Sequence, residues 1–143
     1  MTKRPFIPVR IAVLTVSDTR RLADDKSGQT LANRIAAAGH ILAARDIVTD
    51  DIDAIRSKVL DWSRDAGIDV IVTTGGTGFT GRDVTPEALE PIFDKRMDGF
   101  SAVFHRISYD KIGTSTIQSR ACAGLAHGTY IFCLPGSPGA CRD

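Results

Sequence analysis

The segment that most constrains the fold is Thr73–Gly78, with the sequence TTGGTG. It follows the short apolar run Val70–Val72, which is typical of a buried strand, and it precedes Thr85-Pro86-Glu87, which is typical of a helix start. Glycines let a backbone approach oxygen atoms closely, so that its N–H groups can donate to an anion. A strand, a glycine-rich turn and a helix in this order therefore predict a site for a phosphorylated ligand in an α/β protein.

The rest of the chain alternates strand and helix patterns. Apolar, β-branched runs predict strands at residues 10–17, 41–48 and 69–74. From Ser119 the pattern changes, and 121–126, His127-Gly128 and 129–134 predict a strand, a tight turn and a second strand. This order predicts a three-layer α/β/α sandwich with a mainly parallel sheet and an antiparallel hairpin near the C-terminus.

Apolar residues at helical spacing mark the intervening helices. We expect Ser27 to cap the first helix and Thr85 to cap the third, while Pro91 predicts that the third is kinked or short. The second helix should open at residues 49–51. The expected buried positions are Leu31, Ile35 and Ala38 in the first helix, Ile52, Ile55, Val59, Trp62 and Ala66 in the second, and Phe100, Val103, Phe104 and Ile107 in a fourth.

Size and composition exclude several classes of protein. The 143 residues suit one domain over 1–143, and 18 Lys and Arg against 17 Asp and Glu give no general attraction to nucleic acid or a membrane surface. Three cysteines without a C-x-x-C pair argue against a disulfide framework or a zinc site. With no apolar stretch of membrane-spanning length and no signal-peptide core, a cytoplasmic location is expected.

The candidate site lies where the parallel strands end, because ligands of such sheets bind outside the carboxyl ends of the strands. The strands deliver acidic residues as well as glycine-rich turns to this edge. A carboxylate repels phosphate unless a divalent cation lies between them, so the pattern predicts Mg²⁺ beside a phosphorylated ligand. The residues concerned are Ser17 and Asp18, Asp50 and Asp51, Gly75–Gly78 with Arg82 and Asp83, and Pro135, Gly136 and Ser137.

Each feature also has a purely structural interpretation. The Asp50-Asp51 pair is well placed to cap a helix, and Asp83 could pair with Arg82 or Arg96 at the surface. The GGTG turn is neither a Walker loop nor a Rossmann fingerprint, because the required lysine and glycine spacing are missing. Residue patterns alone therefore predict a phosphate-containing ligand, and a generic nucleotide or flavin phosphate binder stays open.

The longer motifs are more specific. TVSDTR, IVTDD, TTGGTGFTGRDVTPEAL and LPGSPGACR resemble the MoaB/MogA family of molybdenum cofactor biosynthesis from about Arg10 to Asp143, and IGTSTIQSRACAG is closer to the MoaB branch. The resemblance implies the α/β/α fold, a homotrimer or homohexamer, and transfer of AMP from Mg-ATP to molybdopterin with release of pyrophosphate. A non-catalytic carrier or scaffold for molybdopterin is the alternative.

The resemblance also implies roles for individual residues. Asp50 and Asp83 match the two acidic positions tied to catalysis and would hold Mg²⁺. The glycine turn matches the site of the pterin phosphate, and the last glycine-rich loop matches a further binding segment. The expected substrate-binding residues are Ser17, Asp18, Gly75, Gly76, Thr77, Gly78, Ser119, Arg120, Pro135, Gly136 and Ser137.

Overall fold

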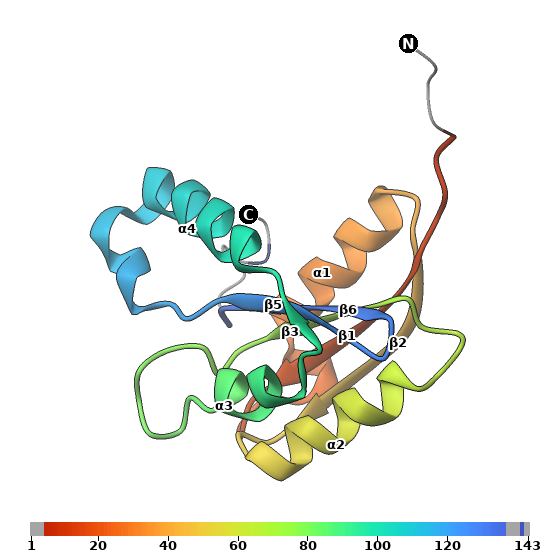
Figure 1. The fold of residues 1–143 in the computed structure, drawn as a ribbon. Helices are drawn as coiled ribbons and strands as arrows, with labels where there is room; N and C mark the ends of the chain where they lie inside the picture. Colours follow the sequence, from red (N-terminus) through yellow and green to blue (C-terminus); the bar gives the residue numbers. More distant parts are fainter. Residues whose placement is uncertain (1–4, 137–140, 142–143) are drawn as a thin grey trace.

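The computed structural model describes residues 5–136 and 141 of the chain. The five predicted strands and the four predicted helices occur in the expected order (Figure 1), and the structure adds the strand β4 and three 3-10 turns. The elements are β1 (Arg10–Val16), η1 (Leu22–Asp24), α1 (Lys26–Ala37), β2 (Ile41–Val48), α2 (Ile52–Ser63), β3 (Val70–Thr74), α3 (Thr85–Leu89), η2 (Glu90–Ile92), β4 (Lys95–Arg96), α4 (Asp98–Ile112), η3 (Gly113–Gln118), β5 (Cys122–Ala126) and β6 (Thr129–Leu134).

The strands form one sheet in the order β2-β1-β3-β6-β5-β4. The first four strands run parallel, β5 is antiparallel to β6, and the two-residue β4 is antiparallel to β5. The hairpin turns at His127 and Gly128, whose φ angles of 51° and 78° match a tight turn that needs left-handed residues. The predicted mainly parallel sheet with an antiparallel hairpin is confirmed, whereas β4 was not predicted.

Helices cover both faces of the sheet, with α1 and α4 on one side and α2 and α3 on the other (Figure 1). Alternate residues of β1 point to opposite faces, as a strand requires. Leu14 belongs to a core cluster with Ile55 of α2, whereas Val13 belongs to a second cluster with Leu31 of α1. These two cores make the three layers of the predicted sandwich.

Both predicted helix caps are wrong. The side chain at the start of α1 that accepts from Gly28 N is that of Asp25, not Ser27, and Val84 precedes α3 without a side-chain cap. The hydroxyl of Ser27 donates instead to Gly136 O, 109 positions away, and the hydroxyl of Thr85 donates to Gly75 O, 10 positions away. A tertiary acceptor has replaced the local one in both cases.

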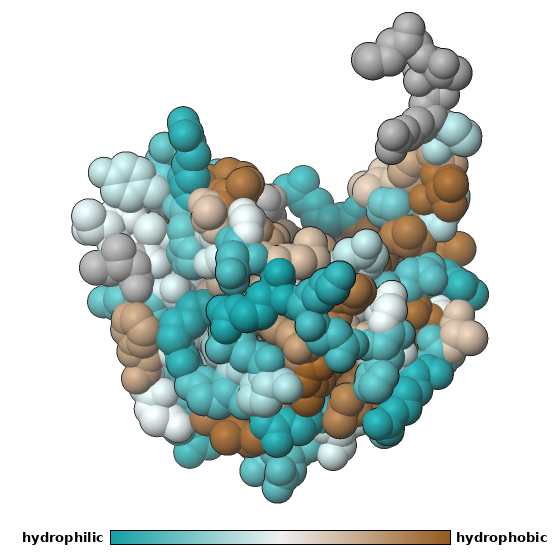
Figure 2. All heavy atoms as spheres, viewed as in Figure 1, coloured by the Kyte–Doolittle hydropathy of each residue, from teal (hydrophilic) through white to brown (hydrophobic). Residues whose placement is uncertain are grey.

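Some expected buried positions are also exposed. Ala38 and Ala66 lie at the surface, because α1 ends at Ala37 and α2 at Ser63. On α4, Phe104 is buried, but Val103 and Ile107 are 61% and 38% exposed. Figure 2 shows that hydrophobic residues on the face drawn there occur in patches among hydrophilic ones.

The remaining expectations on helices and cysteines agree with the structure. As Pro91 predicts, α3 is short and passes into the 3-10 turn η2. All three cysteines are free and buried, so that Cys122 and Cys133 are core residues as expected. None of the helices within the described residues is long and apolar enough to span a bilayer.

Candidate functional site

Hydrogen bonds join the loops that follow the first two strands. Ser17 N donates to Val48 O, and Asp50 N donates to the Oδ1 atom of Asp18. The donor–acceptor distance is 2.9 Å in both hydrogen bonds. The end of β1 is therefore tied to the loop that begins α2. This contact brings two predicted acidic residues together, although the residues are 32 positions apart in the sequence.

The two glycine-rich loops touch each other at Gly75 and Gly136. Gly75 has a φ of +104°, and a Cβ atom there would lie 2.3 Å from the carbonyl oxygen of Val16. A Cβ on Gly136 would lie 3.3 Å from the Cα of Gly75. The hydroxyl of Thr74 donates to Pro135 O over 2.9 Å. Only a residue without a side chain fits at Gly75, and β1, β3 and β6 meet there.

The glycine turn after β3 presents unused donors. The N–H of Gly75 donates to Leu134 O over 2.9 Å, so this amide is not available to a ligand. Within the described part of the chain, the N–H groups of Gly76, Thr77 and Gly78 donate to no protein acceptor. Consecutive free amides in a turn can donate to an anion, so this geometry is compatible with the predicted phosphate site, which stays a prediction.

Thr85 holds this turn in shape. Its hydroxyl donates to Gly75 O over 2.9 Å, and its N–H donates to Gly76 O over 3.0 Å. Gly76 has a φ of +73°, and a Cβ there would lie 2.2 Å from the Thr85 hydroxyl oxygen. A side chain at Gly76 would therefore collide with the protein itself before it met a ligand.

Arg120, in the segment between η3 and β5, extends its side chain across the glycine loop. Its Nε donates to Gly78 O over 2.8 Å, its Nη2 donates to Asp83 O over 2.7 Å, and its Nη1 pairs with Glu87. Its backbone N–H donates to Thr77 O over 2.8 Å. The guanidinium thus fixes the main chain on both sides of the loop, and its predicted contact with substrate stays untested.

Asp83 lies beside the end of the glycine turn, where a Cβ on Gly78 would lie 2.7 Å from a carboxylate oxygen of Asp83. Burial, and next the negative charge of Asp83, raise the pKa of the Asp50 carboxyl above its ordinary value. The Asp83 carboxylate accepts from Thr80 N over 3.0 Å and from the Thr80 hydroxyl over 2.7 Å. The charge of Asp83 thus disfavours ionisation of Asp50, and a cation bound near both carboxylates would relieve that effect.

The structural alternatives for these acids are settled in part. Asp51 is the N-cap of α2 and accepts from Ala54 N, whereas Asp50 is not a cap. The alternative that Asp83 pairs with Arg82 or Arg96 at the surface does not hold. Arg82 pairs with Asp18, and Arg96 lies between Glu90 and Asp98.

A cation fits the acidic side only if a ligand completes its coordination. Among the described residues, there is no group of three or more His, Cys, Asp and Glu side chains able to hold a metal ion. Mg²⁺ commonly takes one or two protein carboxylates, several waters and the oxygens of a substrate phosphate. Asp50 and Asp83 offer two carboxylates of this kind, and whether they hold Mg²⁺ stays a prediction.

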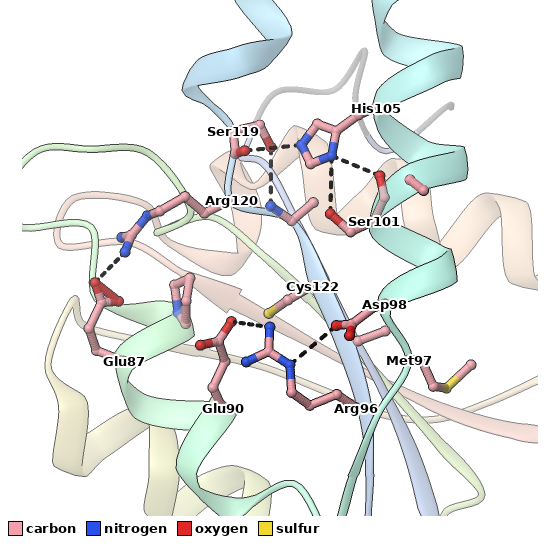
Figure 3. A pocket seen from close by; sticks show the side chains of 14 residues that line it. Glu87, Glu90, Arg96, Met97, Asp98, Ser101, His105, Ser119, Arg120 and Cys122 are labelled. Atoms are coloured by element: carbon pink, nitrogen blue, oxygen red, sulfur yellow. Dashed lines mark hydrogen bonds and ion pairs between the residues drawn. The ribbon is translucent and has the colours of Figure 1, made fainter.

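A cavity of about 570 Å³ lies next to Arg120, between α3, α4 and the start of β5 (Figure 3). The Oγ atom of Ser119 accepts from Ala121 N, and Ser119 O lies 3.0 Å from Nε2 of His105. Ser119 and Arg120 therefore stand between this cavity and the glycine loop. Ser137, the remaining predicted binding residue, lies outside the described residues.

A buried ionic network was missed by the sequence reasoning. The Asp25 side chain has no exposed surface, accepts from the Thr15 hydroxyl and from Gly28 N, and lies 3.4 Å from Nη2 of Arg45 and 3.9 Å from Nη1 of Arg20. An aspartate three residues before a glycine at a helix start was the available signal. The contact between this network and the last glycine-rich loop joins Arg20 to Gly136 O, 116 positions apart, so no local sequence pattern predicts it.

Comparisons with known proteins agree with this architecture. A family model described as "Probable molybdopterin binding domain" matches residues 12–143. The protein named molybdenum cofactor biosynthesis protein B from Escherichia coli (strain K12) is 49% identical over 137 residues, which cover 96% of this chain and 81% of that protein. Its namesake from Bacillus subtilis (strain 168) is 44% identical over 135 residues, which cover 94% and 79%.

Solved structures give the same result. A crystal structure of a molybdenum cofactor biosynthesis protein B superposes with a TM-score of 0.93 at 42% identity, over 97% of this chain and 87% of that chain. The tungsten cofactor synthesizing protein MoaB from Pyrococcus furiosus superposes with a TM-score of 0.83 at 36% identity, over 94% and 86%. In sequence and in fold, the chain therefore belongs to the MoaB/MogA family of molybdopterin-binding-domain proteins.

Proposed function

We propose that this protein acts in molybdenum cofactor biosynthesis by transferring AMP from Mg-ATP to the terminal phosphate of molybdopterin, with release of pyrophosphate. The names of its relatives support the pathway and the pterin ligand. The observation that carries the proposal is the position of the free amides of the glycine turn, which lie between the Gly136 loop and the mutually repelling pair Asp50 and Asp83. An anion-binding turn beside a cation-binding pair suits the joining of two phosphates.

The glycine turn would hold the acceptor phosphate. The amides of Gly76, Thr77 and Gly78 can donate to its oxygens without any rearrangement, since Thr85 and Arg120 already fix the surrounding main chain. Donors that are fixed before the ligand arrives lose little entropy on binding. The glycine turn would therefore both bind the acceptor phosphate and position its oxygen for attack.

The reaction is an in-line substitution at phosphorus. An oxygen of the acceptor phosphate forms a bond to the α-phosphorus of ATP, and the bond from that phosphorus to the bridging oxygen of pyrophosphate breaks. A phosphate monoester has a second pKa of about 6, so the nucleophile is already anionic at neutral pH. The protein therefore needs to position two anions and reduce their repulsion, and it needs no strong general base.

Asp50 and Asp83 would hold the Mg²⁺ that accompanies ATP. When bound, this ion neutralises charge on the nucleotide phosphates and on the departing pyrophosphate. Asp18 is less suitable as a ligand, because it pairs with Arg82 and accepts from Asp50 N. The Asp18 side chain instead fixes the main chain at Asp50, and so orients the neighbouring carboxylate.

The test is release of pyrophosphate from ATP in the presence of molybdopterin and Mg²⁺. We expect Asp50→Ala and Asp83→Ala each to lower turnover about 100-fold or more, while the Kd for molybdopterin changes little. Asp53→Ala is the matched control, because Asp53 is exposed in the first turn of α2, away from the loop contacts. Unchanged turnover in either loop variant would exclude the proposed metal role.

The same assay separates the enzyme from a carrier. A carrier would bind molybdopterin through the same glycine loops, but it would release no pyrophosphate and would be indifferent to the Asp83→Ala change. A wild-type protein that binds molybdopterin tightly and yields no pyrophosphate above the protein-free rate would exclude AMP transfer.

A further inference from the structure

A positive group lies beside the last glycine-rich loop, which touches the glycine turn at Gly75, whereas Asp83 lies beside Gly78 at the other end of that turn. Its centre is the enclosed carboxylate of Asp25, on which Arg20 and Arg45 converge. Burial of an ionised carboxylate is costly unless cations and hydrogen bonds compensate it, and here the Thr15 hydroxyl and Gly28 N also donate to it. Two guanidinium groups around one carboxylate leave the group with a net charge of +1.

Arg20 reaches from this group to the last glycine-rich loop. Its Nη1 donates to the Ser27 hydroxyl oxygen and to Gly136 O, both over 3.2 Å. Its backbone N–H donates to the Ser17 hydroxyl oxygen over 3.2 Å, which fixes the loop after β1. The Arg20 side chain is thus held at the point where the loops after β1 and β6 meet.

The guanidinium of Arg20 keeps donors for a ligand. Its side chain is 36% exposed, against 16% for Arg45. All contacts that its guanidinium makes with described residues use Nη1, which leaves Nε and Nη2 without a partner in that part of the chain. A guanidinium with a fixed plane and two remaining nitrogen donors suits two oxygens of one phosphate.

The opposite side of the turn has the opposite charge. Among the ion pairs of the described residues, Arg82 pairs with Asp18, and no cation pairs with the Asp50 or Asp83 carboxylate. These three carboxylates and the one guanidinium together carry a net charge of −2. A phosphate that carries its own Mg²⁺ matches the negative side, whereas a phosphate monoester without a metal matches the positive side. The two reacting phosphates are thereby distinguished by charge.

We propose that Arg20 binds the terminal phosphate of molybdopterin, the acceptor in the reaction, and so is a substrate-binding residue of this site. The inference rests on the proposed function for the identity of the acceptor. It goes further in assigning the two phosphates to different sides of the glycine turn. Asp25 then acts as a positioning residue, because it touches the guanidinium and not the ligand.

The test compares molybdopterin with its dephosphorylated form, by calorimetric titration without ATP or Mg²⁺. The wild-type protein should prefer the phosphorylated pterin, and Arg20→Met should lose about 10- to 100-fold in affinity for that form only. Arg20→Lys, which keeps the charge without the planar donors, should recover part of the loss. Arg21→Met is the matched control, since the neighbouring Arg21 is exposed.

A purely structural role for Arg20 predicts a different pattern. Ser27→Ala removes the 2.6 Å hydrogen bond to Gly136 O and keeps the cation. If Arg20 only holds the loop in place, Ser27→Ala and Arg20→Met will lower the affinity for both pterin forms to a similar extent. That result would overturn the proposal, as would a fall in affinity for Mg-ATP with an unchanged affinity for molybdopterin.

Failure of the proposed function has a separate signature. A wild-type protein that distinguishes the two pterin forms through Arg20 but releases no pyrophosphate would exclude AMP transfer and leave the Arg20 contact intact. A wild-type protein that releases pyrophosphate while Arg20→Met retains full preference for the phosphorylated pterin would exclude only the Arg20 contact.

Discussion

The two sides of the glycine turn are built in different ways. On the positive side, Asp25 is fully enclosed and joined to its partners by a network that reaches the interior of β1 through Thr15. On the negative side, Asp50 and Asp83 lie on partly exposed loops and repel each other. The positive side is therefore part of the folded core, whereas the negative side needs a ligand to neutralise it.

The largest expected effect tests the positive side. Asp25→Ala should lower the free energy of unfolding by about 3–5 kcal/mol, because it leaves the largely buried Arg45 without its counter-ion. Urea denaturation measures this loss. Asp24→Ala, one residue away and exposed, should change stability by less than about 0.5 kcal/mol. Equal effects in the two variants would show that the enclosed carboxylate does not stabilise the fold.

A smaller loss of stability is expected at Gly76, in the glycine turn that separates the two sides. Gly76→Ala forces a φ of +73° on a residue with a Cβ and brings that atom onto the Thr85 hydroxyl, so we expect a loss of about 2 kcal/mol in stability. Gly81→Ala is the matched control in the same loop, because a Cβ there meets nothing within 4 Å. The control should be neutral or slightly stabilising. Thermal unfolding of the two variants decides whether the turn is fixed by its backbone conformation.

The loop that carries Asp83 depends on one arginine. Arg120→Met removes donors to Gly78 O and Asp83 O, and we expect a loss of about 1 kcal/mol in stability. The rate of amide hydrogen exchange should increase more in residues 77–83 than in β1. Arg106→Met on the exposed face of α4 should change neither quantity. A uniform rise across the chain would mean that Arg120 stabilises the whole fold and not this loop.

The residues chosen for these variants also separate the features that local sequence patterns predict from those that they miss. The strand runs and the His127-Gly128 turn are local patterns, and topology alone places the ends of parallel strands at one edge. The acidic residues and glycine turns could therefore be grouped correctly. Ser27 was expected to cap its own helix, but its hydroxyl bonds to Gly136 O, 109 residues away. A contact at that separation leaves no periodic signal, so Arg20 was missed for the same reason.

The smallest expected effect compares two aspartates with opposite pKa shifts. Burial and the charge of Asp83 raise the pKa of Asp50, whereas a hydrogen bond from Lys58 lowers the pKa of Asp46. An aspartate with a raised pKa in the folded state lowers stability once it ionises, and the penalty disappears as the pH falls through that raised value toward about 4. An aspartate with a lowered pKa adds stability above about pH 4 and loses it as the pH falls through the folded-state value.

Asp50→Asn should therefore stabilise the ligand-free protein at pH 7, and Asp46→Asn should destabilise it. Each change should amount to about a few tenths of a kcal/mol, since solvent screens both side chains. Urea midpoints at pH 7 and pH 4 measure the difference, which should shrink for Asp50→Asn at the lower pH. If Asp50→Asn destabilises the protein at pH 7, the carboxylate already has a favourable partner without ligand. In that case the negative side is as preorganised as the positive one, and the contrast in charge, not in rigidity, must distinguish the two phosphates.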